Sequence, residues 1–207
     1  MDALPLHLSA GQRAALAAAY ATPPRAYHDF HHVEAVLRHY AEVAAGPGWK
    51  QPREVALAIL YHDAVYVPGR RDNEARSARF ALGQIARWQP DAGIDPARVA
   101  QLIGLTARHG RWRPADFDAD PAPDDVRLFL DCDMAILGAA AAEFDAYDRG
   151  IADEYRGKLP GWLFRLRRRR FLRALLARER IFLSDFFHAR LDAPARANLR
   201  RALHAGH

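Results

Sequence analysis

The chain has 207 residues, of which 50% are hydrophobic and 27% are charged. This length and apolar content suffice for one compact domain with a hydrophobic core, and they exclude disordered and collagen-like chains. Cys132 is the only cysteine, so the fold cannot depend on an intramolecular disulfide. We expect no membrane span, because no apolar stretch is long enough. Asp2, Pro5 and His7 argue against a signal peptide, so we expect a cytoplasmic protein.

The formal net charge is +5, which raises the question of nucleic-acid binding. Lys50 and Lys158 are the only lysines among 30 basic residues. This skew toward arginine, in a chain that is also rich in alanine, indicates a biased codon composition more than a selected binding surface. We therefore expect no nucleic-acid partner, although a modest positive field would help to attract an anionic substrate.

Residue composition predicts an all-α fold. Alanine, leucine and arginine dominate the chain, threonine occurs only at Thr22 and Thr106, and valine and isoleucine are too scattered to build a sheet. Neither an internal repeat nor a linker divides the chain. We therefore predict a single domain over residues 1–207 with about 8–10 helices. Its core would lie within about 25–140, and C-terminal helices over about 140–205 would pack on that core.

Capping residues, prolines and glycines divide this domain into individual helices. Ser9 and Asp29 are suitable N-caps, Pro52 occupies a favoured first-turn position, and Pro23-Pro24 and Pro68-Gly69 interrupt the helical pattern. The predicted helices in chain order are about 10–20, 30–45, 52–66, 73–88, 96–109 after an Asp95 cap, 124–137, 140–156, 161–178, 180–188 and 194–204. The longest polar loop is predicted over 110–123.

Acidic residues within apolar helices are the main anomaly of this sequence. Residues 55–61 are apolar without interruption, and His62 and Asp63 lie inside the continuing run. Asp131 and Asp133 interrupt a second apolar helix in the same way. Burial of an unpaired carboxylate is costly, and one basic partner could not easily serve all three acids. A divalent metal ion could do so.

Histidine spacing supports this metal site. His28 and His32 are one helical turn apart on one face. Two imidazoles and two carboxylates from three helices would leave positions free on an octahedral ion, as a catalytic metal requires. His62 and Asp63 point about 100° apart on a helix, so one ion must lie over the bisector of both side chains. We expect one divalent ion, which this ligand set allows to be manganese, iron, cobalt, nickel, zinc or magnesium.

The order His32, His62-Asp63, Asp133 resembles the H…HD…D signature of the HD superfamily of metal-dependent phosphohydrolases. Over about residues 25–200 the chain also resembles a small bacterial single-domain group, the predicted metal-dependent HD phosphohydrolases. The motifs that carry this likeness are Tyr27-His28 with His32-Val33, the sequence YHDAVY at 61–66, Asp72-Asn73-Glu74 with Ser77, Thr106 with His109, DCDMAILG at 131–138, Glu154-Tyr155 and ARANL at 195–199.

This resemblance implies a helical bundle of the HD type in which His32, His62, Asp63 and Asp133 bind the metal ion. Asp131 lies two residues before Asp133, about 200° around the helix, and is interpreted as a supporting or capping acid. The predicted activity is hydrolysis of a phosphomonoester or nucleotide by a metal-activated water molecule. Asp63 would also accept a hydrogen bond from that water.

Other candidate catalytic residues each have a structural alternative. Many HD enzymes that cleave nucleotide monophosphates carry an acid three residues beyond the His-Asp doublet, where this chain has Tyr66. Glu74 is the substitute candidate for positioning water or the leaving group, or else a favourable acid in a first helical turn. His109 is a candidate general acid or phosphate ligand, or else a cationic helix C-cap. His28 either orients His32 or contacts substrate.

The predicted partner is a small anionic phosphate ester, whose phosphate Arg108 or Lys158 would neutralise. A di-iron oxygenase of the HD type is an alternative, although His109 is the only histidine between the doublet and Asp133. A non-catalytic module that binds nucleotide or nucleic acid through the arginine run 167–170 is another, but that run fits a solvated helix face better. Phe182, Phe186 and Phe187 are core residues or a homodimer surface.

Overall fold

The computed structural model describes residues 4–22 and 25–205, and this part of the chain contains helices and no β-strand. The helices, in chain order, are α1 (Ala10–Ala21), α2 (Phe30–Ala45), α3 (Pro52–Tyr61), α4 (Asn73–Trp88), α5 (Pro96–Thr106), the 3₁₀ helix η1 (Pro114–Phe117), α6 (Pro123–Met134), the 3₁₀ helix η2 (Ala135–Gly138), α7 (Ala141–Tyr155), α8 (Gly161–Leu176) and α9 (Asp185–Ala205). The predicted all-α fold is confirmed. Pro23-Pro24, predicted to break the first helix, lies outside the described residues.

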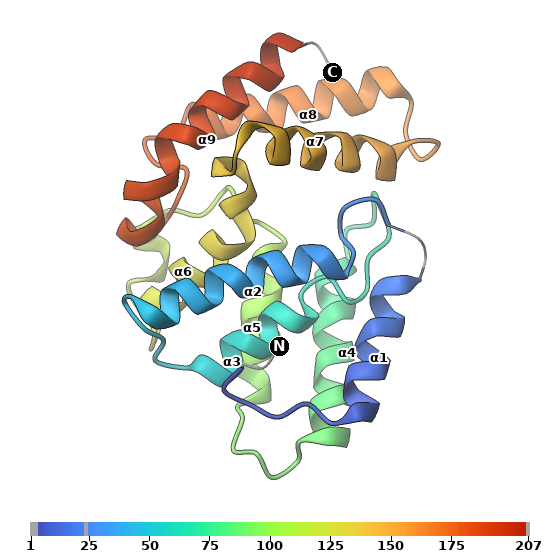
Figure 1. Ribbon diagram of the computed structural model, residues 1–207, viewed down its shortest axis with the longest axis vertical. Helices are drawn as coiled ribbons and strands as arrows, with labels where there is room; N and C mark the ends of the chain where they lie inside the picture. The colour runs from blue at the N-terminus through green and yellow to red at the C-terminus, as the bar shows by residue number, and fades with distance from the viewer. Residues whose placement is uncertain (1–3, 23–24, 206–207) are drawn as a thin grey trace.

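Figure 1 shows how the helices are arranged around one core. Helices α1, α3, α4 and α5 form the lower half of the view, α7, α8 and α9 form the upper half, and α2 and α6 lie between them. The buried apolar side chains form one cluster to which every α-helix from α1 to α9 contributes. Within the described residues, no helix combines the length and the apolar character that crossing a membrane requires.

The predicted helix starts are confirmed at the level of individual hydrogen bonds. The side chains of Ser9, Asp29 and Asp95 each accept hydrogen bonds from main-chain N–H groups in the first turn of the helix that follows. These bonds satisfy donors that have no partner within the helix. Local capping chemistry therefore places α1, α2 and α5.

Helix α3 ends at Tyr61, whereas the sequence predicts a helix through Tyr66. One reason is that the N–H groups of Val65 and Val67, which a helix through Tyr66 would use for bonds to the carbonyls of Tyr61 and Asp63, donate to side chains of α4 instead. Another is that the Arg25 guanidinium takes the carbonyl oxygens of Asp63 and Ala64, at 2.6 and 3.1 Å. The His-Asp doublet thus lies at the end of α3 and not inside it.

Side chains of α4 hold the chain that follows this doublet. The Ser77 hydroxyl accepts from the N–H of Val65 and donates to the carbonyl of the same residue. The Asn73 amide makes the same pair of bonds with the main chain of Val67. Residues 62–67 are therefore fixed by side-chain contacts where helical hydrogen bonds are lacking.

The predicted ends of two other helical regions are also wrong. Helix α5 stops at Thr106, three residues before the expected His109. In the C-terminal part, α9 is one helix with Pro194 inside it, where two shorter helices were predicted. Packing offsets the hydrogen bond that Pro194 cannot donate, because Ala195 and Leu199 are fully buried and the Asn198 amide donates to two carbonyls near η2.

Phenylalanines of the C-terminal region belong to the core. Phe182 and Phe187 are fully buried, and Phe186 is packed against the same cluster. The core interpretation of these three residues is confirmed.

Candidate metal centre

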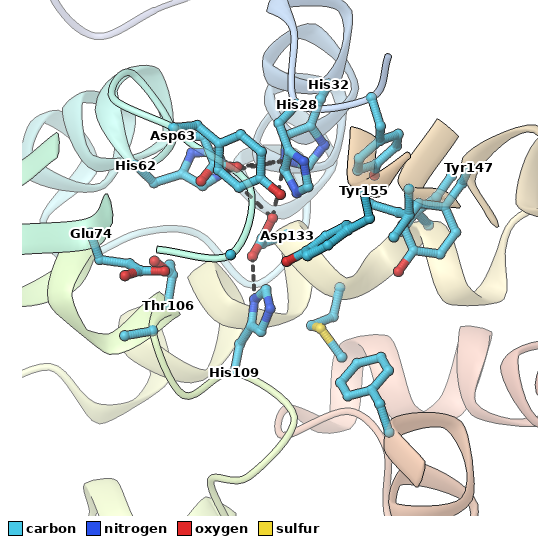
Figure 2. A pocket seen from close by; sticks show the side chains of 18 of the residues that line it. His28, His32, His62, Asp63, Glu74, Thr106, His109, Asp133, Tyr147 and Tyr155 are labelled. Atoms are coloured by element: carbon cyan, nitrogen blue, oxygen red, sulfur yellow. Dashed lines mark hydrogen bonds and ion pairs between the residues drawn. The ribbon is translucent and has the colours of Figure 1, made fainter. Parts of the chain in front are cut away.

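Four predicted metal ligands converge at one point between the two halves of the molecule (Figure 2). His32 comes from α2, His62 and Asp63 from the end of α3, and Asp133 from α6. The Nε2 atoms of His32 and His62 are 3.1 Å apart. Asp133 Oδ1 lies 3.2 Å from the first of these nitrogens and 3.5 Å from the second.

Asp63 completes the group. Its Oδ2 atom lies 3.2 Å from Nε2 of His62 and 3.8 Å from Nε2 of His32. His32, His62 and Asp63 each offer one ligand atom, and these three atoms all lie within 4.8 Å of one another. Asp133 faces both imidazoles of this group. The arrangement is of the kind that can hold a metal ion.

The orientation of His62 supports this interpretation. Its Nδ1 atom lies 2.8 Å from the carbonyl oxygen of Ile59, and a carbonyl can only accept a hydrogen bond. Nδ1 therefore carries a proton, which leaves Nε2 as the atom that faces the cluster. Metal-binding histidines are held in this way, with the second ring nitrogen donating to a carbonyl or a carboxylate.

His109 holds the second oxygen of Asp133. The two side chains meet at 2.7 Å between His109 Nδ1 and Asp133 Oδ2. Burial lowers the pKa of His109, but the Asp133 carboxylate outweighs this effect, and the resulting pKa is raised above its ordinary value. The imidazole thus orients a predicted ligand, a contact that neither sequence interpretation of His109 included. Its predicted role as general acid or phosphate ligand remains a prediction, and the side chain lines the cavity described below.

Opposing charges are closely balanced within the cluster. Burial lowers the pKa of His32, which favours its neutral form. Burial also disfavours the charged form of His62, but Asp63 and Asp133 outweigh this effect and raise its pKa. Burial would raise the pKa of Asp63, but His62 reverses the direction and lowers it. A cation that binds between these groups therefore competes with the imidazole protons.

Buried acids elsewhere in the protein have a different role. The Asp131 carboxylate accepts bonds from the N–H groups of Leu183 and Ser184 and from the Ser184 hydroxyl. Asp125 likewise accepts from two main-chain N–H groups. Asp131 is thus a capping acid, one of the two roles expected for it. Within the described part of the chain, Asp63 and Asp133 accept no bond from a main-chain N–H group and face imidazoles instead.

A cavity of about 470 Å³ opens from this cluster. The polar side of the cavity is formed by the entrance to α2, the segment after α3, the start of α4 and the end of α5, and it includes His28, Glu74 and His109. Residues of η2, α7 and α8 form a largely apolar and aromatic wall opposite, consisting of Ile136, Leu137, Tyr147, Ile151, Tyr155, Leu159, Phe164 and Phe171. In Figure 2, Glu74 and the tyrosines Tyr147 and Tyr155 lie on opposite sides of the metal ligands.

The two predicted phosphate ligands lie outside the lining of this cavity. Arg108 is exposed, and its guanidinium stacks on the ring of Trp112 at 4.8 Å. Lys158 is also exposed. The basic side chains that line the cavity are Arg70, Arg71, Arg167 and Arg168. The sequence offers no signal that separates these arginines from the many others.

The arginine run 167–170 does not form a uniformly solvated face. The Arg168 side chain is only 11% exposed and forms an ion pair with Asp148 at 2.6 Å. Its guanidinium also donates to the hydroxyl of Tyr147 and stacks on that ring. Arg168 is therefore fixed in the cavity wall, whereas Arg167 and Arg170 are exposed.

Sequence reasoning missed the roles of two residues at the site. The Arg25 guanidinium donates to the carbonyls of His28 and Asp63, and so connects the entrance of α2 to the doublet. Glu154 is buried and accepts hydrogen bonds from the segment that precedes α2. Glu154 follows Ile151 by one turn, so the criterion that identified Asp63, an acid on an apolar helix face, also applies to it. The role of Arg25, by contrast, has no such signal in the sequence, because its acceptors are main-chain carbonyls, which every residue has.

Comparison of the chain with protein-family models, with curated proteins and with solved structures finds no significant match.

Proposed function

We propose that this protein is a metal-dependent phosphohydrolase of the HD type that cleaves a small phosphate monoester or nucleotide. The observation that carries the proposal is the convergence of two imidazole nitrogens and two carboxylates on one point at the base of a cavity. These carboxylates face imidazoles and not main-chain N–H groups. The H…HD…D order of the same residues supports the proposal.

His32, His62, Asp63 and Asp133 are the residues that would hold the metal ion. The donor set fits, because two nitrogens and two oxygens suit a divalent transition metal and leave coordination positions open. A bound divalent ion supplies positive charge for the phosphoryl oxygens and acidifies water. Manganese, iron, cobalt, nickel, zinc and magnesium all remain candidates for this position.

The remaining residues of the cavity would bind and orient the ester. Arg71 and Arg167 are exposed and line the cavity, where they can attract an anionic substrate. His28 and Glu74 lie on the polar side and are candidates for contact with the phosphate or the attacking water. The apolar wall would accommodate the organic part of the ester. Hydrolysis breaks the bond between phosphorus and the leaving oxygen and yields an alcohol and inorganic phosphate.

The test begins with elemental analysis of protein purified without chelator. A panel of phosphate esters is then assayed with manganese, cobalt, nickel and magnesium. We expect turnover by the metal-loaded protein and a loss of at least about 100-fold in Asp63→Asn, which removes a ligand charge. Glu143→Gln, an exposed acid on α7, is the matched control and should retain wild-type turnover.

Two results would contradict the proposal: no turnover of any ester by metal-loaded protein, or full turnover by Asp63→Asn. About two irons per chain would instead favour the oxygenase. Salt-dependent binding of nucleic acid that survives Asp63→Asn and is lost when residues 167–170 are replaced would favour a binding module.

A further inference from the structure

Glu154 makes three hydrogen bonds to the segment that leads into α2. Its Oε1 atom accepts from the N–H groups of Tyr27 and His28, each at 2.9 Å. Its Oε2 atom lies 2.6 Å from Nδ1 of His28. The Glu154 side chain is only 2% exposed. One buried carboxylate thus binds both the main chain and the imidazole of the same residue.

Close contact between helices fixes this arrangement. Gly150 lies one turn before Glu154 on α7, and both residues are buried. A Cβ atom at Gly150 would lie 3.0 Å from the carbonyl oxygen of Ala26 and 3.1 Å from Cβ of Tyr27. The absence of a side chain at this position therefore lets α7 approach the segment closely enough for Glu154 to reach it.

The contact with Glu154 determines which nitrogen of His28 faces the cavity. A carboxylate accepts hydrogen bonds, so Nδ1 carries the proton and Nε2 is left for another partner. The imidazole is stacked on the ring of Tyr66, with the centroids 4.1 Å apart, which restrains its rotation. His28 and Tyr66 both line the cavity that opens from the candidate metal cluster, and Figure 2 shows His28 beside the candidate ligands.

We propose that Glu154 is a positioning residue that holds His28 through Nδ1 and so presents the unprotonated Nε2 to the cavity as a hydrogen-bond acceptor for the attacking water. The proposal rests on the phosphohydrolase function above and assigns Glu154 a role within it. His28 contacts the attacking water, and Glu154 acts through His28. A buried carboxylate that orients an active imidazole in this way is typical of outer partners in metal and catalytic sites.

Glu154→Gln separates this role from simple anchoring of the main chain. The Gln side-chain oxygen can still accept from the N–H groups of Tyr27 and His28. Its NH₂ group would then face Nδ1 of His28, where it can only donate. Nδ1 must become the acceptor, and the imidazole proton moves to Nε2. The substitution thus preserves the backbone contacts while it reverses the hydrogen bond to the imidazole.

A double-mutant cycle tests the coupling between the two residues. We expect Glu154→Gln to lower kcat/KM by about 10- to 100-fold with unchanged metal content. In the His28→Gln background the same change should have no further effect, because its target is absent. An equal loss in both backgrounds would overturn the proposal, since Glu154 would then act independently of His28. Glu143→Gln controls for removal of a negative charge from α7.

Nitrogen-15 NMR of the imidazoles gives a readout that does not depend on activity, with His28→Gln used to assign the His28 signals. We expect a protonated Nδ1 in the wild type and a protonated Nε2 in Glu154→Gln. Inorganic phosphate carries a P–OH group that can donate to an unprotonated Nε2. When added to the metal-loaded wild type it should therefore shift the His28 Nε2 signal toward that of a protonated nitrogen, a shift that Glu154→Gln, with Nε2 already protonated, should not show. A wild-type His28 with its proton on Nε2, or one unaffected by phosphate, would refute the proposal. If phosphate shifts the His28 signal but the protein hydrolyses no ester, the proposed phosphohydrolase function is refuted. The pairing of Glu154 with His28 would still stand in that case.

Discussion

Replacement of Arg25 by lysine should loosen the candidate metal centre without removing any of the candidate ligands. The Arg25 guanidinium donates to four main-chain carbonyls: Nη1 to those of His28 and Asp63, and Nη2 to those of Ala19 and Ala64. It thereby connects the end of α1, the entrance to α2 and the doublet after α3. The Arg25 side chain also stacks on the ring of Tyr20.

The expected loss follows from the geometry of the two side chains. A guanidinium presents donors on two separate nitrogens, whereas a lysine ammonium is a single point that reaches one or two of these carbonyls. At least two hydrogen bonds are therefore lost. A bond from a charged donor contributes about 1.5 kcal/mol or more, so Arg25→Lys should lower the free energy of unfolding by about 3 kcal/mol. For a chain of this length, that corresponds to a decrease in Tm of roughly 6–12 °C.

Thermal unfolding of the metal-free protein, followed by circular dichroism, measures this change. Arg13→Lys is the matched control, because the exposed Arg13 guanidinium donates, within the described residues, to a single carbonyl, that of Leu8. We expect less than about 1 kcal/mol for this control. Calorimetric titration with manganese should also show weaker binding to Arg25→Lys than to Arg13→Lys, because the carbonyl of Asp63 is no longer held.

Equal Tm values for Arg25→Lys and Arg13→Lys, together with equal manganese affinities, would refute this reasoning. Such a result would mean that Ser77 and Asn73 alone fix the segment after α3. A lower Tm with unchanged manganese affinity would show that Arg25 stabilises the fold but does not position the doublet.

Two further predictions concern parts of the fold outside the metal centre. Burial alone would raise the pKa of Asp120, but the ion pair with Arg98 outweighs burial, and the resulting pKa is below its ordinary value. The ion pair therefore stabilises the fold above about pH 4. This stabilisation is lost as the pH falls through the lowered pKa of Asp120. Asp120→Asn should therefore cost about 3 kcal/mol at pH 7, and urea titrations should show a smaller difference from wild type at pH 3; a constant difference would contradict the ion-pair argument. Gly138→Ala should destabilise the protein by about 1–3 kcal/mol, because its Cβ would lie 2.7 Å from Cβ of Leu191 on α9. Gly83→Ala in α4, where a Cβ meets no atom within 4 Å, should instead stabilise the protein by about 0.5–1 kcal/mol, and equal effects of the two changes in thermal unfolding would exclude the contact with Leu191 as the cause.

Most helices and the candidate ligands could be predicted from the sequence, because the physical causes are local. The capping bonds of Ser9 and Asp29 involve residues within three positions, and the range of α4 was predicted without error. Asp63, Asp131 and Asp133 were found because an acid in an apolar run requires a partner wherever the segment packs. This requirement does not depend on knowing the fold. The choice of Asp133 and not Asp131 as a candidate ligand came from the resemblance to the H…HD…D order.

Tertiary structure decided where α3 ends, which arginines line the cavity and how the ligands are held. The bonds from Arg25 to Asp63 and from Glu154 to His28 join positions 38 and 126 residues apart. Every residue has a carbonyl, so a main-chain acceptor leaves no mark in the sequence. Arg168 and Arg170 are the same residue type and cannot be distinguished in the sequence. The packing of α8 nevertheless buries Arg168 against Asp148 and leaves Arg170 exposed. Composition and periodicity thus determined where the helices lie and which acids need partners, and long-range packing determined which side chains surround those acids.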